Sequence, residues 1–123
     1  MRSILVVAAV LAFVAPAAAQ SGSQPVHKIG EQGVKAPVLV REVKPAYTRD
    51  AMDRGVQGTV EVDAVILTDG TVGDVTVKRS LDPDLDEEAV KATKQWRFRP
   101  GTKDGEPVNV QVFIELTFTL RNR

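Results

Sequence analysis

The chain has 123 residues, enough for one domain, and its 43% hydrophobic and 26% charged residues are ordinary for a globular protein. Basic and acidic residues number 16 each, so the net charge is zero and no overall field favours nucleic acid or acidic lipid. Cysteine is absent, which excludes disulfides and thiolate metal sites.

Residues 1–19 are predicted to be a secretory signal peptide. Arg2 provides a positive start, Ile4 to Ala15 form an apolar run, and Pro16 with Ala17–Ala19 supplies a small-residue cleavage signal. A membrane-spanning helix needs about 20 apolar residues, more than this run has. We expect an exported protein that begins near Gln20; the alternative is an uncleaved N-terminal anchor.

Residues 20–36 are polar and glycine-rich without helical or strand periodicity, and are predicted to be a flexible leader before a domain at 37–123. The leader holds the one histidine, His27, with no neighbouring ligand residues. A metal site needs three or four ligands, so we predict no metal.

A short helix is expected after Pro45, which keeps the preceding residue extended. Thr48 suits the N-cap and Gly55 the C-terminal end.

A hairpin is expected next. Gly58 to Leu67 alternates apolar and polar residues, as a half-buried strand does. The Asp69–Gly70 pair favours a tight turn, and Thr71 to Ser80 forms the returning strand.

The second helix is predicted to begin at Asp82 or Asp84 and to run to about Trp96, with Asp84 and Glu87 spaced as a capping box. One apolar stripe contains Leu85, Ala89, Ala92 and Trp96. The stripe favours a core tryptophan over an exposed platform for stacking bases.

The last strand gives the clearest pattern in the chain. Its inward positions are all apolar: Val108, Val110, Val112, Ile114, Leu116, Phe118 and Leu120. A slip of one residue would reverse every side chain, so the register is strongly fixed.

These elements predict an α+β fold of two layers, a three-stranded antiparallel sheet with one main helix on one face and a short N-terminal helix. The hairpin's second strand carries glycine and charged residues, which disfavour pairing of an exposed edge with another chain. Val108–Leu120, in contrast, has one charged residue, Glu115. The last strand is therefore a candidate for binding an extended segment by strand addition. Alternatively, its sides are covered by the first strand and by a dimer partner or the Pro37–Val43 segment.

An enzyme is not expected. The carboxylates of residues 82–88 lie where helix capping explains them, and the chain shows no nucleophile–base set or phosphate loop. We predict no cofactor.

Three segments of the chain occur in a specific combination, "GVQGTVEVDAVILTDGTVGDVTVKRS", "LDEEAVKATKQWRFRPG" and "GEPVNVQVFIELTFTL". With this combination, the sequence resembles the C-terminal domain of the TonB family of energy transducers over Val43 to Leu120. It implies a periplasmic domain that grips an extended segment of an outer-membrane transporter against its last strand. In full transducers, a membrane helix and a long spacer precede this domain.

The chain departs from that family pattern at its N-terminal side. A signal peptide stands in place of the anchor, and the leader, even extended at ~3.3 Å per residue, is too short to cross the periplasm. The usual Tyr-Pro pair is Tyr47–Thr48 here. A periplasmic location is therefore expected, with an inner-membrane anchored form as the alternative.

The resemblance places the partner-binding residues on the last strand and before the first helix. They are Val110, Gln111, Val112, Phe113, Ile114, Lys44, Pro45 and Tyr47. The expected partner is an outer-membrane transporter or another envelope protein, in energy-coupled transport across the outer membrane. The alternative is a self-associating structural domain, a homodimer without direct energy transduction.

Overall fold

The computed structural model describes residues 24–120, so the predicted signal peptide lies outside the described residues. None of the helices in this range is long and apolar enough to cross a membrane. The elements in chain order are β1 (Val26–Lys28), β2 (Val34–Lys35), β3 (Val38–Arg41), α1 (Arg49–Asp53), β4 (Gly58–Ile66), β5 (Val72–Arg79), α2 (Pro83–Thr93), β6 (Arg97–Arg99), β7 (Thr102–Lys103), β8 (Glu106–Pro107) and β9 (Asn109–Phe118).

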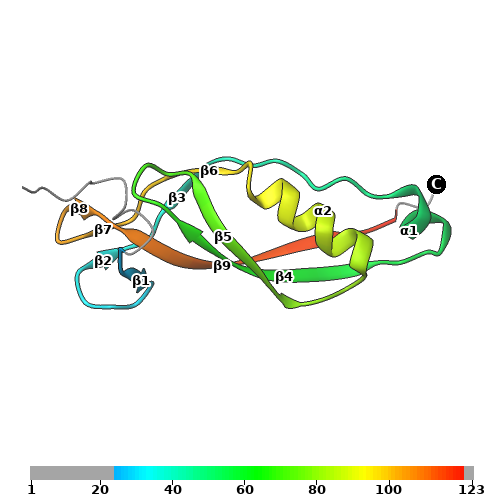
Figure 1. Ribbon diagram of the computed structural model, residues 1–123, viewed down its shortest axis with the longest axis horizontal. Coiled ribbons are helices and arrows are strands. Elements are labelled where there is room, and N and C mark those ends of the chain that lie inside the picture. Colours follow the sequence, from blue (N-terminus) through cyan, green and yellow to red (C-terminus); the bar gives the residue numbers. More distant parts are fainter. Residues whose placement is uncertain (1–23, 121–123) are drawn as a thin grey trace, which may run out of the picture.

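The main sheet has four strands in the order β1-β9-β4-β5 (Figure 1). The three expected antiparallel strands are β9, β4 and β5, with β4 in the centre. The expectation of three strands was incomplete, because β1 adds parallel to β9 and two small sheets form beside it, β2-β7-β8 and β3-β6. These additional strands have two to four residues, too few to show a period-2 pattern in the sequence.

Helix α2 covers one face of the main sheet, as expected for two layers (Figure 1). The inward side chains of β4 and β9 pack against the apolar stripe of this helix. Fully buried members of the core are Ala51, Val60, Val62, Ala64, Ile66, Leu85 and Ala89.

The caps form where short polar side chains allow them. The Ala51 N–H donates to Thr48 Oγ1 at 3.1 Å, as predicted for α1. Asp82 is the N-cap of α2 and accepts hydrogen bonds from the Asp84 and Leu85 N–H groups. The expected Asp84–Glu87 capping box is replaced by Asp86, whose carboxylate accepts from the Leu81 and Asp82 N–H groups.

The tryptophan is a core residue, as predicted, but α2 ends before it. Trp96 is 8% exposed, whereas the helix ends at Thr93 and tightens there, with the Trp96 N–H donating to the Thr93 carbonyl. Trp96 Nε1–H donates to the Val43 carbonyl at 2.7 Å. This bond ties the end of α2 to the extended segment that runs from β3 to α1.

The Pro37–Val43 segment does not cover the last strand. Its strand β3 pairs with β6, with Leu39 opposite Phe98. The hairpin turn contacts β6 as well, because the Phe98 N–H donates to the Gly70 carbonyl at 2.9 Å. Gly70 has a φ of +87°, the conformation predicted for the Asp-Gly turn.

Candidate functional site

Strand β9 is fully paired on one side only. It follows β4 from Val110 opposite Ile66 to Phe118 opposite Gly58. On its other side β1 pairs with Asn109–Gln111. From Val112 to Phe118 that side has no strand partner within residues 24–120. We call this stretch of backbone the free edge.

Two hydrogen bonds show which main-chain groups face the free edge. The Leu67 N–H, just after β4, donates to Thr71 at 2.8 Å on the β5 side. The Leu120 N–H, just after β9, donates to the side-chain Oε1 of Gln57 at 2.8 Å, on the β4 side. Backbone groups alternate in direction along a strand, and the β4–β9 register is continuous. The N–H and C=O groups of Phe113, Glu115 and Thr117 therefore point away from β4, toward the free edge.

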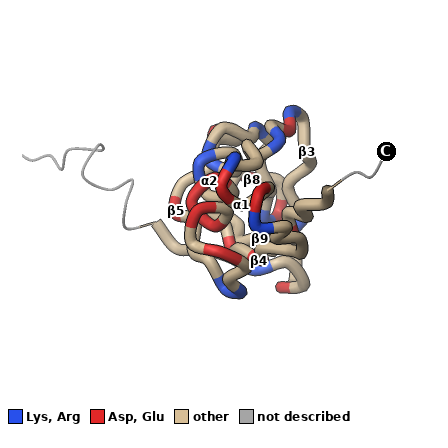
Figure 2. Tube along the Cα trace, turned by 90° about the vertical axis from the view of Figure 1, so that its right-hand side faces the viewer, with Lys and Arg blue, Asp and Glu red and all other residues tan. Residues whose placement is uncertain are grey.

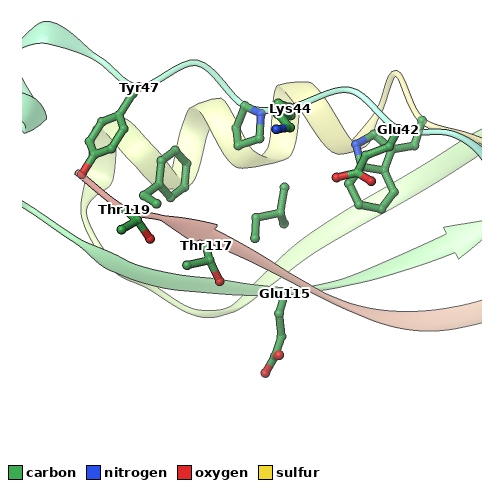
Figure 3. Close-up of a pocket in the computed structure, with 10 residues that line it drawn as sticks. Glu42, Lys44, Tyr47, Glu115, Thr117 and Thr119 are labelled. Carbon is green, nitrogen blue, oxygen red and sulfur yellow. The ribbon is translucent and has the colours of Figure 1, made fainter. Parts of the chain in front are cut away.

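A groove of about 260 Å³ runs beside the free edge. One wall is the extended segment before α1, and the other is the end of β9 (Figure 3). Five consecutive residues of the chain, 115–119, line the groove, so it follows the edge of the strand rather than one of its faces. An extended peptide needs a space of this form, open along a row of main-chain donors and acceptors.

Aromatic side chains hold the two walls in position. The Tyr47 hydroxyl donates to the Val56 carbonyl, and its ring meets Phe118 edge-on, with centroids 5.4 Å apart. The Trp96–Val43 bond fixes the same segment further upstream. The groove is thus formed by folded, anchored segments.

Charged groups around the groove carry both signs. Glu42 and Lys44 lie on the segment before α1, and Glu115 projects from β9 on the far side of the strand (Figure 3). Acidic and basic positions also neighbour one another along the described chain (Figure 2). The groove therefore gives no single-sign field of the kind that nucleic acid would need.

The predicted partner-binding residues fall into three groups. Lys44, Pro45 and Tyr47 line the groove. Val112, Phe113 and Ile114 lie on the free edge just upstream of it, with Phe113 56% exposed. Val110 and Gln111 lie opposite β1, which covers that part of the strand. The role of all eight residues in partner binding stays a prediction.

Several residues of the groove were missed from the sequence. They are Glu42, Trp96, Glu115, Leu116, Thr117, Phe118 and Thr119. The alternating pattern runs unchanged through 115–119, so the sequence predicted the strand but not which part of it lies open. That depends on the position of β1, which pairs with residues more than eighty positions away.

Residues 24–120 contain no group of three or more His, Cys, Asp or Glu side chains that could hold a metal ion. His27 lies in β1, and its Nδ1 is 3.0 Å from Glu31 Oε1. The Glu31 carboxyl has a lowered pKa, chiefly because of this contact with His27.

Comparison with known proteins identifies one family. The family model of the Gram-negative bacterial TonB protein C-terminal matches residues 43–120. "Protein TonB" of Vibrio cholerae is 36% identical over 109 residues, covering 85% of this chain and 42% of that protein. "Protein TonB" of Pseudomonas aeruginosa is 32% identical over 111 residues, covering 85% of this chain and 32% of that protein. The chain therefore spans less than half the length of these relatives.

A solved structure supports the same assignment at the level of the fold. The solution structure of the Pseudomonas aeruginosa TonB C-terminal domain has a TM-score of 0.59 and 30% identity. The match covers 78% of this chain and 95% of that one.

Proposed function

This chain belongs to the family of TonB C-terminal domains, a family of energy transducers, and we propose that it captures an extended segment of an outer-membrane transporter by strand addition to β9. The free edge beside the groove carries this proposal. Phe113, Glu115 and Thr117 offer main-chain groups to an incoming strand, and the groove leaves room for that strand's inward side chains.

The inward side chains of the captured segment would be apolar. On the helix-side face of β9, Leu116 and Phe118 belong to the core and line the groove at its base, and the opposite wall presents Pro45 and Tyr47. Burying apolar area gives about 25 cal/mol per Å², while the main-chain hydrogen bonds fix the direction of the segment. We place this binding in the periplasm, as a step of energy-coupled transport across the outer membrane.

Nuclear magnetic resonance titration would test the proposal. Synthetic peptides tiled across the periplasm-facing segments of the source organism's outer-membrane transporters would be added to nitrogen-15-labelled protein. We expect a binding peptide to shift and protect the amides of Phe113, Glu115 and Thr117, because these N–H groups face the free edge.

A matched pair of variants identifies the mode of binding. Thr117→Pro removes one edge-facing donor at a position where an edge strand tolerates proline, and should weaken binding by about tenfold or more. Thr117→Val keeps the N–H group and should bind nearly as the parent does. A folded Thr117→Pro protein that binds with unchanged affinity would rule out strand addition at this edge.

A further inference from the structure

We propose that the row of side chains Arg79–Glu61–Glu115 makes the free edge selective for a strand with a basic residue opposite Glu115, and against a second copy of this chain. The inference rests on the proposed function, since it specifies the segment that the same edge captures. It concerns the face of the sheet that α2 does not cover.

Three rows of side chains cross this open face and end at the free edge. In the first, Asp63 of β4 lies opposite Phe113 of β9. In the third, the Thr59 and Thr117 hydroxyls are 3.1 Å apart and hydrogen-bonded. The middle row places two carboxylates directly opposite each other, Glu61 of β4 and Glu115 of β9. Like charges directly opposite each other destabilise a sheet.

Only one of these two carboxylates has a basic neighbour in the row. Arg79 of β5 lies opposite Glu61, with Nη1 3.7 Å from Oε2. Glu115 is exposed and is the last residue of the row, at the free edge. The three side chains line one hollow on the open face. An added strand would place its own side chain next to Glu115, and a lysine or arginine there would give the pair of carboxylates a basic group on each side.

The same row disfavours pairing with a second copy. Two copies that join their free edges symmetrically must run antiparallel. The register that uses Phe113, Glu115 and Thr117 of both copies sets Glu115 opposite Glu115. A shift by two residues, which keeps edge-facing groups opposite each other, brings Thr117 opposite Gln111 in one direction, and β1 covers Gln111. A shift in the other direction brings Phe113 opposite residue 119, beyond the end of β9. The register that pairs the whole free edge of both copies thus puts four carboxylates in one row, Glu61 and Glu115 of each copy.

Sedimentation of the full exported chain tests the effect on self-association without any ligand. Glu115→Thr removes the like-charge contact and keeps a residue that favours strands. We expect the parent to dimerise only weakly, and Glu115→Thr to dimerise at concentrations at least about fivefold lower than the parent requires. High salt should reduce the difference between the dimerisation concentrations of the two proteins, because it screens exposed charges. Identical sedimentation of both proteins at all concentrations and salt levels would overturn the proposal.

Peptide binding tests the choice of residue. The probes are three peptides of sequence Thr-Val-Thr-Val-X-Val-Thr-Val-Thr with X as Lys, Ser or Glu, which read the same in either direction. The parent should prefer Lys to Glu by about fivefold, and Glu115→Lys should reverse the order. An unchanged order would also overturn the proposal. If neither these peptides nor the transporter-derived peptides bind, the proposed function fails, and sedimentation still decides the role of the row.

Discussion

Among single residues, Trp96 joins the fold to the groove most directly. Its indole N–H donates to the Val43 carbonyl, so one side chain links the end of α2 to the wall before α1. Its ring lies beside Phe98, with centroids 6.2 Å apart. The sequence predicted the burial of Trp96 from its spacing, but it contained no signal for the carbonyl, because Val43 lies 53 residues earlier.

Replacing Trp96 tests this link. Trp96→Phe keeps an aromatic ring and leaves the Val43 carbonyl without its donor, which should lower the free energy of unfolding by about 1–3 kcal/mol. Urea denaturation followed by circular dichroism measures the change. The control is Phe113→Leu, a change at an exposed aromatic residue, which should stay within about 0.5 kcal/mol. A change of that small size in Trp96→Phe would mean that the bond contributes little.

Between elements, an ion pair connects the two helices. Arg54, at the end of α1, donates through Nη2 to Asp82 Oδ1 at 2.8 Å, and Asp82 is also the N-cap of α2. The pKa of Asp82 is lowered, first by the hydrogen bond from Arg54 and then by the N–H groups of Leu85 and Asp84. The carboxylate therefore serves a local cap and a tertiary contact at once.

This arrangement predicts an acid-dependent loss of stability. The folded-state pKa of Asp82 lies below its ordinary value of 3.8, so its contribution is complete above that pH and is lost as pH falls through the lowered pKa. Asp82→Asn retains a capping side chain and removes the charge. Compared with the parent, it should unfold at lower urea near neutral pH and lose less stability between about pH 5 and pH 2. If the free energy of unfolding fell with pH in the same way for the parent and for Asp82→Asn, the role given to the Asp82 charge would be wrong.

At the scale of elements, the long periodic segments could be predicted and the short ones could not. The strands β4 and β9 were predicted from alternation, because a half-buried sheet imposes a period of two, and β5 was predicted as the strand that returns from the Asp69–Gly70 turn. The end of α2 was placed at Trp96 although the helix stops at Thr93, since the apolar stripe continues past it. Nothing local marks Val26–Lys28 as a strand, because its partner in β9 supplies the pairing.

For the whole molecule, that missed strand decides where the candidate site lies. The sequence indicated an open last strand, and the structure leaves it open only from Val112 onward. The binding residues expected at 110–114 therefore overlap the free edge only in part, while the groove lies at 115–119. A single sequence can identify an edge strand by its lack of charged residues, proline and glycine. It gives no signal for a strand of three residues, formed by a polar leader, that pairs with part of that edge.

A substitution in β1 tests its position as the upstream limit of the free edge. His27 is the central residue of β1, opposite Val110, and it contacts Glu31. His27→Pro removes the main-chain N–H group at the centre of β1 and should speed hydrogen exchange at the Gln111 amide. The pairing of β9 with β4 should remain, and the free energy of unfolding should change by about 1 kcal/mol or less. His27→Ala removes the Glu31 contact and keeps the N–H group, so Gln111 should retain more protection. Equal protection of Gln111 in the parent and both variants would show that β1 does not close this part of the edge in solution, and a captured segment could then extend to Asn109.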